Sequence, residues 1–524
     1  MDPVTLSVLS HAMTGVAEEM GTVLVRSAYS SNIKERRDCS AALFDSDARL
    51  VAQAAHIPVH LGAMSESVRV VAARDPAAGD VWILNDPFAG GNHLPDITLV
   101  APIEIDGERL GYAATRAHHS DVGGMRPGSM PADSREIYQE GLVIPPVRLV
   151  ARGEWVTDVL DLVTANSRTP DLRRGDLEAQ VAAGLVAADR LREIADRWGR
   201  DVLSTAFEEI IAYGERRSRQ FVRALPDGRY VATGEIEGDG VTDDDIPIAV
   251  AVTIDGEDVT VDFDGTADAV AGNVNCPLAV TRSACCFALR VLLPNDVPAN
   301  DGTYAPLTVL ARPGSLVNAR RPSAVVAGNV ETSQRIADTV LLALSQVADL
   351  PAQGQGTMNN LILGGPGGGR DGGPDGEPRA GRPWTYYETL AGGQGASSRG
   401  PADSGVHVGM TNTLNTPVEA LEMEYPMRVE RYELDASTAG AGLHPGGAGL
   451  VRSIRVLSSA TVSLLTDRRR HAPAGAHGGQ PGAVGVNDVD GQTLPPKATR
   501  LVEPGSVVTI RTPGGGGWGA PTSA

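Results

Sequence analysis

Apolar positions in the first part of the chain recur first with a helical period and then in short runs. After Pro3, the apolar residues at roughly helical spacing are Leu6, Val8, Leu9, Met13, Val16 and Met20. Because proline is favoured in the first turn, this stripe predicts an N-terminal helix. Three apolar runs bounded by Gly, Pro and Asp then predict strands at 81–86, 96–105 and 110–115.

Helical periodicity returns between residues 176 and 225. A second helical segment there follows a break near Gly199, and the two segments together predict a helical hairpin. The stripe of the first segment consists of Leu177, Val181, Leu185, Ala188 and Leu191. Beyond the hairpin, alternating strands are predicted across 226–270, a buried helix at 283–293 and a longer helix at 331–348.

The remaining pattern completes the fold class. The Gly- and Pro-rich stretch 364–383 predicts a loop, and strands with tight turns return from residue 421. At about 150 residues per domain, a chain of 524 residues is expected to form several. We therefore expect an α+β, multi-domain protein built on mixed β-sheet domains. Its expected parts are an N-terminal α/β region with polar loops (1–175), the helical hairpin (176–225), a central α+β region (226–420) and a β-rich C-terminal region (421–524).

Charge and lysine content exclude two classes of function. Acidic residues outnumber basic ones 65 to 45, for a net charge of −20, which argues against nucleic acid as a partner. Lysine occurs only at Lys34 and Lys497, and neither lies in a G-x-x-x-x-G-K-[ST] loop. A Walker-type ATP site in this chain is therefore excluded.

Cysteine usage and hydropathy bear on the compartment. The four cysteines form no C-x-x-C pair, which fits reduced thiols better than a disulfide scaffold. No apolar run approaches the roughly 18 residues of a membrane span, and the acidic N-terminus lacks the basic start of a signal peptide. We expect a soluble, cytoplasmic protein that does not bind a membrane.

Two polar loops beside the predicted strands carry the same short phrase. The first reads His93-Leu-Pro-Asp96 and the second His118-His-Ser-Asp121, and Asp86 lies near the start of the first loop. Imidazole and carboxylate form a mixed N/O set of the kind that binds Mn, Fe or Zn. Loops at strand ends can bring such ligands together and leave positions open for water and substrate.

Simpler explanations compete with a metal. A single His-x-x-Asp phrase is explained equally well by a histidine that bonds a carboxylate and so holds its loop. Two such phrases, joined by one predicted strand pair, favour a metal. Upstream, His56 and His60 either flank the same site or are buried packing histidines, which is the simpler expectation. Nucleophilic catalysis is poorly supported, because there is no G-x-S-x-G elbow and Cys285 and Cys286 lie in the predicted buried helix.

The chain resembles the hydantoinase B/oxoprolinase family, which also includes acetone carboxylase alpha subunits. The matching phrases run nearly end to end and keep the expected order. They include NDPFAGGNHLPD (85–96), RAHHSDVGG (116–124), EIYQEGLVIPPVRL (136–149), AGNVETSQRIAD (327–338), YYETLAGGQGAS (386–397), LHPGGAGLVRSIRV (443–456) and TPGGGGWG (512–519).

The resemblance implies a divalent metal at the two His-x-x-Asp loops. In the carboxylase branch, histidine and aspartate from these segments hold manganese, and the match marks His93, Asp96 and His118 in this sequence. Asp86 and Asp121 match by their position in the motif. Which metal is bound (Mn, Fe or Zn) stays open.

The resemblance further implies the catalytic B-type chain of an ATP-dependent cyclic-amide hydrolase, in a hetero-oligomer. An A-type partner would bind ATP and phosphorylate the carbonyl oxygen of a lactam or hydantoin, as in 5-oxoproline or N-methylhydantoin hydrolysis. The metal would then lower the pKa of a water molecule for attack on the activated carbon. His119 or Glu140 could relay protons, although Glu140 is equally suited to cap a turn.

Two alternatives stay open. In the first, the chain is the alpha subunit of an ATP-dependent ketone carboxylase, and the metal site stabilises an enolate that attacks CO2. In the second, it is a non-catalytic scaffold for the A-type subunit. The compact length favours the amidase over the carboxylase, and the intact metal motifs argue against the scaffold.

Overall fold

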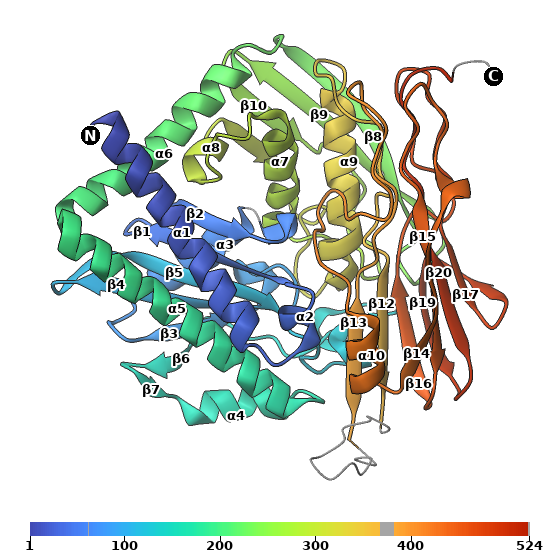
Figure 1. The fold of residues 1–524 in the computed structure, drawn as a ribbon, viewed down its shortest axis with the longest axis horizontal. Helices are drawn as coiled ribbons and strands as arrows, with labels where there is room; N and C mark the ends of the chain where they lie inside the picture. Colours follow the sequence, from blue (N-terminus) through green and yellow to red (C-terminus); the bar gives the residue numbers. More distant parts are fainter. Residues whose placement is uncertain (61, 367–381, 522–524) are drawn as a thin grey trace.

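The computed structural model describes residues 1–60, 62–366 and 382–521, and it confirms the α+β, multi-domain class (Figure 1). The strands in these ranges form four sheets, of seven, four, four and five strands. Residues 367–381 of the predicted loop 364–383 lie outside the described residues. None of the described helices is long and apolar enough to cross a membrane.

The N-terminal sheet has antiparallel strands in the order β2-β1-β5-β4-β3-β6-β7. It contains all three strands predicted in this part of the chain. Its strands are β1 Cys39–Asp45, β2 Leu50–Ala55, β3 Val81–Leu84, β4 Asp96–Ile105, β5 Glu108–His118, β6 Val147–Ala151 and β7 Glu154–Trp155.

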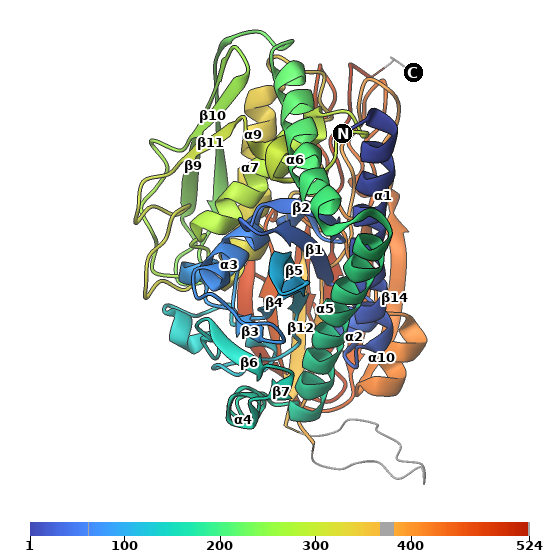
Figure 2. The same cartoon turned by 90° about the vertical axis from the view of Figure 1, so that its left-hand side faces the viewer.

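The two faces of this sheet are covered by different helices, because successive side chains of a strand point to opposite faces. Leu43 of β1 packs with the N-terminal helix α1 and with α5, whereas Phe44 packs with α3. Figures 1 and 2 both show α1 and α5 side by side over the sheet. These helices are α1 Pro3–Ser27, α3 Ala63–Ala72 and α5 Pro170–Trp198.

Helix α1 confirms the predicted N-terminal helix. The side chain of Asp2 caps its first turn by accepting hydrogen bonds from Val4 N and Thr5 N. Met13 and Met20 are fully buried against the sheet, as the stripe predicts, but Val8 is 50% exposed. Val8 directly precedes Leu9, and neighbouring helical residues do not share a face.

The two helices predicted between 176 and 225 are α5 and α6, Arg200–Val222, and they are interrupted at Gly199 as expected. Gly199 has a φ of +88°, which is readily adopted only by glycine. Helix α5 lies mainly along α1, and α6 lies mainly against the short helix α8, Asp301–Tyr304. The short helix α4, Thr157–Ala165, precedes them.

The central region combines a small sheet with two buried helices. Its strand order is β11-β10-β9-β8, in which only the β10–β11 pair is parallel. The predicted strands and both predicted helices are present, and a π-helical turn over Gly328–Thr332 precedes the second helix. The elements are β8 Gly228–Glu237, β9 Asp245–Asp255, β10 Asp258–Asp262, β11 Leu307–Leu310, α7 Leu278–Leu292 and α9 Ser333–Leu344.

Two antiparallel sheets pack face to face over one apolar core in the C-terminal region, at the right of Figure 1. Their orders are β13-β12-β16-β19 and β14-β15-β20-β17-β18. The first sheet joins strands from both sides of residue 421. The domain boundaries expected from the sequence stay predictions. The elements are β12 Asn360–Gly365, β13 Trp384–Glu388, α10 Val418–Glu424, β14 Met427–Asp435, β15 Gly449–Val456, β16 Ala460–Leu465, β17 Val486–Val489, β18 Gln492–Leu494, β19 Lys497–Val502 and β20 Val507–Arg511.

Candidate metal centre

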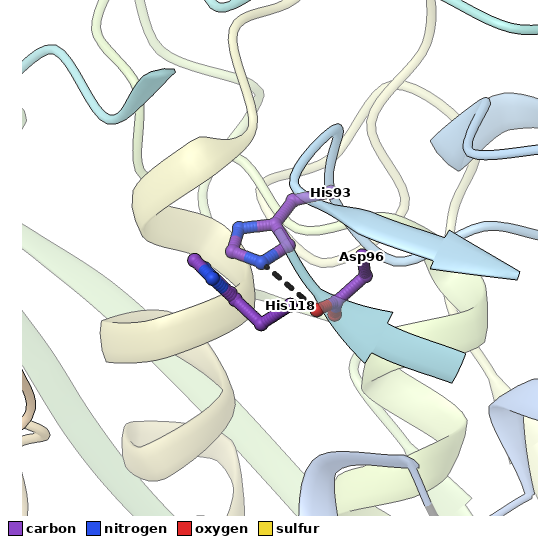
Figure 3. Close-up of side chains that lie close together, drawn as sticks. All are labelled: His93, Asp96 and His118. Atoms are coloured by element: carbon purple, nitrogen blue, oxygen red, sulfur yellow. Dashed lines mark ion pairs between the residues drawn. The ribbon is translucent and has the colours of Figure 1, made fainter. Parts of the chain in front are cut away.

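Three of the predicted metal ligands meet at one end of the N-terminal sheet (Figure 3). Asp96 begins β4, His118 ends β5, and the antiparallel register pairs these two positions. His93 lies in the loop before β4, where a tight turn places its Nε2 3.4 Å from Asp96 Oδ1. One potential ligand atom from each of the three side chains lies within 4.8 Å of the others.

The polar atoms of this cluster fit a bound metal. All three residues are at most 2% exposed. Among the described residues, no hydrogen-bond partner exists for either nitrogen of His93, for His118 Nε2 or for Asp96 Oδ2. Buried polar atoms without a partner are rare and costly in native proteins. Two imidazoles and a carboxylate match the donor set of a divalent metal site, which would satisfy these atoms.

The protonation states of the cluster also suit a metal. Burial would raise the pKa of Asp96, but the nearby His93 and His60 outweigh it and hold this pKa well below its ordinary value. Burial, together with His93, holds the pKa of His118 well below its ordinary value. The carboxylate is therefore ionised and this imidazole neutral at neutral pH, which are the forms that bind metals.

The sequence left open whether His60 flanks the candidate site or is a buried packing histidine. It is buried, as expected of a packing histidine, but its Nε2 lies 3.5 Å from Asp96 Oδ2 and its Nδ1 lies 2.9 Å from Ser40 Oγ. His56 instead has Nδ1 3.8 Å from the Cys39 sulfur. His60 thus supports the Asp96 carboxylate through the oxygen that His93 does not contact.

A buried guanidinium holds the loop that carries His93. Arg116 lies on β5, two residues before His118 and on the same face, and donates hydrogen bonds to Asn92, Thr98 and Ser67 side chains. Burial lowers its pKa to about 10, which leaves it charged at neutral pH. This network fixes the loop 85–95 against the sheet.

Residues from distant parts of the chain, which no sequence motif singled out, contact His118. The ring of Tyr387, on β13, stacks on His118 with centroids 4.4 Å apart, and Asn32 Nδ2 lies 3.3 Å from His118 Nδ1. The Tyr387 hydroxyl donates to Asn360 Oδ1, and Asn360 Nδ2 donates to Glu331 of the π-helical turn. Tyr387 and Glu331 lie in phrases shared with the resembling family, but only tertiary contacts reveal their link to His118.

The structure does not bring Asp86 and Asp121 into the cluster. Asp86 accepts a hydrogen bond from Phe88 N and pairs with Arg321. Asp121 accepts hydrogen bonds from three backbone amides, including that of Gly128, and from the Arg168 guanidinium at 2.9 Å. Both carboxylates instead accept hydrogen bonds that hold their own loops. Neither has an oxygen atom in the cluster of ligand atoms formed by His93, Asp96 and His118.

The two predicted proton carriers make their hydrogen bonds to residues outside the three-ligand cluster. His119 points to the opposite face of the sheet from His118, and its Nε2 donates to Gln180 of α5 at 2.9 Å. Burial raises the pKa of Glu140 to about 7, and this carboxyl accepts hydrogen bonds from Ser134 Oγ and from the backbone amides of Val325 and Val326. Their proton-relay role stays a prediction.

Comparison with known proteins gives the family. The sequence model described as Hydantoinase B/oxoprolinase matches residues 2–521, which is nearly the whole chain. The chain belongs to the hydantoinase B/oxoprolinase family. The resemblance seen in the sequence is thereby confirmed.

Relatives of the hydantoinase B/oxoprolinase chain differ in length. An uncharacterized protein of Methanocaldococcus jannaschii is 38% identical, and the alignment covers 99% of this chain and 91% of that protein. The 5-oxoprolinase 1 of Arabidopsis thaliana is also 38% identical over 99% of this chain, which spans only 42% of that protein. A putative B-type chain of a D-/L-hydantoinase from Pseudomonas sp. is 33% identical over 99% of this chain and 90% of its own.

Two solved structures share the fold of this family member. The ATP-dependent caprolactamase of Pseudomonas jessenii superposes with a TM-score of 0.90 at 29% identity, covering 99% of this chain and 91% of the other. Nucleotide-free acetone carboxylase superposes with a TM-score of 0.83 over 99% of this chain and 76% of the other. At 17% identity, the second likeness concerns the fold alone.

Proposed function

We propose that this chain is the metal-dependent, catalytic B-type chain of an ATP-dependent cyclic-amide hydrolase. The observation that carries the proposal is the buried His93, Asp96 and His118 cluster, with unpartnered ligand atoms, in a member of a family whose named relatives include 5-oxoprolinases and a caprolactamase. A divalent metal in such a site supplies Lewis acidity and makes water nucleophilic near neutral pH.

The chain's own residues prepare the site for that chemistry. The Asp96 carboxylate is held between His93 and His60, so its position is already fixed before a substrate arrives. Tyr387 and Asn32 fix the plane of the His118 ring, and the Arg116 network fixes the loop that carries His93. Rigid ligands favour one coordination geometry and keep the reacting groups in place.

We further propose a separate A-type partner that binds ATP and phosphorylates the ring carbonyl oxygen. Two observations support it. The chain lacks a Walker lysine, and it spans only 42% of the length of 5-oxoprolinase 1, whose remaining length is available for a second activity. The Pseudomonas relative named as a B-type hydantoinase chain matches over nearly its full length, which fits the same division between two chains.

Reconstitution tests this function. The purified chain would be mixed with its A-type partner, ATP and either 5-oxoproline, hydantoin or caprolactam, and ring-opened product would be measured. We expect turnover only with both chains and ATP, no ATP hydrolysis by this chain alone, and loss of turnover in His93→Ala. A metal-loaded complex that opens none of these rings would contradict the proposal.

A further inference from the structure

The ring of Tyr387 restricts how the imidazole of His118 can tilt. The two rings stack with an interplanar angle of 9° and centroids 4.4 Å apart. His118 Nδ1 also lies 3.3 Å from Nδ2 of Asn32, in the short helix α2, Ser31–Lys34. A contact at one ring nitrogen leaves the ring able to tilt about that point, and the stacked ring prevents this tilt. Tyr387 therefore controls the direction of His118 Nε2, which has no partner among the described residues.

Tyr387 is itself held at both ends. At the backbone end, it pairs with Ile362 of β12, and Arg36 Nη1 donates to its carbonyl oxygen at 2.7 Å. The Arg36 guanidinium carbon lies 4.9 Å from the ring centroid, which adds a cation–π contact. At the far end, the hydroxyl donates to Asn360 Oδ1 at 3.0 Å. The ring can leave its place on His118 only if it loses this hydroxyl bond.

The amide of Asn360 can accept that bond in one orientation only. Its Nδ2 donates to Glu331 Oε1 at 3.0 Å and to Leu465 O at 2.8 Å. A flipped amide would turn its oxygen toward these two acceptors and its N–H groups toward the Tyr387 hydroxyl. Glu331 Oε1 acts as an acceptor here, since it also receives the backbone amide of Met358 at 3.1 Å. Glu331 thus selects the orientation in which Asn360 holds the hydroxyl.

Glu331 lies in a rigid part of the backbone. It is fully buried and belongs to the π-helical turn Gly328–Thr332 that precedes α9. A side-chain carbon added at Gly328 would lie 1.9 Å from the Asn275 carbonyl oxygen, so the turn packs directly against that segment. Single π-helical turns within helices are frequent at functional sites. The fixed turn makes Glu331 Oε1 a fixed acceptor for Asn360.

We propose that Glu331 is a positioning residue for the candidate metal ligand His118. Glu331 orients the Asn360 amide, and the amide holds the Tyr387 hydroxyl. The Tyr387 ring then fixes the plane of the imidazole. Because the lone pair of an imidazole nitrogen lies in the ring plane, a tilted ring would direct it away from the metal. The proposal rests on the proposed function only for the metal at His118, and it adds residues that control the affinity and geometry of that metal.

Cobalt titrations of the full-length chain, without ATP, partner or substrate, test it. Competition with a chelator gives the Kd for Co²⁺, and the visible absorption spectrum of bound Co²⁺ reports its coordination geometry. Tyr387→Phe keeps the stacked ring and loses only the hydroxyl. We expect it to raise the Kd about three- to ten-fold, as for one lost hydrogen bond, and to change the spectrum. Glu331→Ala should have the same two effects, whereas Glu331→Gln keeps an oxygen acceptor and should bind nearly as wild type does.

A double variant shows whether the residues act in one chain. If Glu331 acts through the Tyr387 hydroxyl, Glu331→Ala combined with Tyr387→Phe should bind Co²⁺ no more weakly than the weaker single variant. Asn360→Ala removes the middle link and enters the same cycle if Glu331→Ala does not fold. Tyr386→Phe is the matched control, because Tyr386 is a buried neighbour on the opposite face of β13. It should leave the Kd and the spectrum unchanged.

The outcomes separate positioning from folding and from the proposed function. A purely structural role for Glu331 would lower the thermal midpoint of the metal-free protein and leave the Kd and the spectrum as in wild type. That result, additive losses in the double variant, an unchanged Kd in Tyr387→Phe, or no Co²⁺ binding by wild type would overturn the proposal. Ring opening by the wild-type complex would be unaffected if only the positioning role failed. Conversely, coupled losses of metal affinity without ring opening would keep that role and refute the hydrolase.

Discussion

Asp96 and His118 stand directly opposite each other in neighbouring antiparallel strands, so the register of the N-terminal sheet places two of the three candidate ligands side by side. Their side chains share the face that also carries Arg116, two residues before His118. A slip of one residue between β4 and β5 would send one ligand to the opposite face. The buried residues that fix this register therefore also fix the candidate metal site.

The first prediction concerns metal content. His93→Ala and Asp96→Ala should each lose bound metal, as measured by elemental analysis of the purified protein, while circular dichroism shows a retained fold. Within the described chain His93 makes no side-chain hydrogen bond and only the 3.4 Å contact with Asp96, so its removal disturbs little of the fold. The lost packing should cost about 1–3 kcal/mol, which a chain with several cores tolerates.

The matched control for these variants is His471→Ala. His471 is a partly exposed histidine that pairs with Asp245 and is not a member of the cluster, so its removal should leave metal content unchanged. Metal content equal to wild type in both His93→Ala and Asp96→Ala would refute the assignment of the site.

The second prediction separates a ligand from its support. His60→Ala should keep a measurable metal site but weaken its affinity about 10- to 100-fold, the usual effect of losing a group that orients a ligand. The reason is that His60 contacts the Asp96 carboxylate but is not one of the three residues whose ligand atoms cluster. Metal titration with a competing chelator measures the change. His56→Ala is the control from the same segment, and equal affinities in the two variants would argue against a special role for His60.

The local part of this structure was predictable from the sequence because its signals are local. The stripe from Leu9 to Met20 predicted α1, and apolar runs bounded by turn formers predicted β4 and β5. The sequence pattern wrongly included Val8 in the buried stripe, because Val8 is apolar but lies on an exposed face of the helix. Helix packing, such as that of α5 along α1, depends on contacts that no short window contains.

The candidate site likewise has a part that local sequence signals predicted and a part that depends on tertiary contacts. His93, Asp96 and His118 could be proposed as ligands from the sequence because a repeated phrase places Asp96 and His118 at the ends of paired strands and His93 in the loop before them. The phrase could not show that the Asp121 carboxylate accepts hydrogen bonds from its own and neighbouring loops. Nor could it show Tyr387 on the His118 ring, since β13 belongs to a different sheet.

The third prediction concerns pH and Glu331. Burial, with Asp467 nearby, raises the pKa of this carboxyl from an ordinary value of 4.5 to about 7. Since the folded chain binds this proton more tightly than the unfolded chain, the resulting stability is present below pH 4.5 and is lost as the pH rises through about 7. Glu331→Gln keeps the group neutral. Relative to wild type, the free energy of unfolding of the variant should therefore rise with pH, by on the order of 3 kcal/mol.

Urea unfolding of metal-free protein at a series of pH values measures this difference. Glu178→Gln replaces an exposed glutamate and should leave the pH dependence of wild type unchanged. Parallel pH curves for wild type and Glu331→Gln would show that the Glu331 carboxyl titrates normally in the folded chain.

The last prediction distinguishes the hydrolase from a ketone carboxylase, which ligand variants cannot do because both activities would use the same three residues. In a hydrolase, an oxygen atom from water becomes part of the product carboxylate, whereas in a carboxylase the new carboxylate oxygens come from bicarbonate.

The reconstituted complex would therefore turn over 5-oxoproline or hydantoin with ATP in heavy-oxygen water, and the product would be analysed by mass spectrometry. We expect at least one solvent oxygen in each newly formed carboxylate, after subtracting the exchange seen in product incubated alone. The expectation rests on the 29% identity and full-length superposition with the caprolactamase, against a likeness to acetone carboxylase that extends only to the fold. Consumption of a ketone and bicarbonate, with no ring-opened product from any lactam or hydantoin, would instead assign the carboxylase.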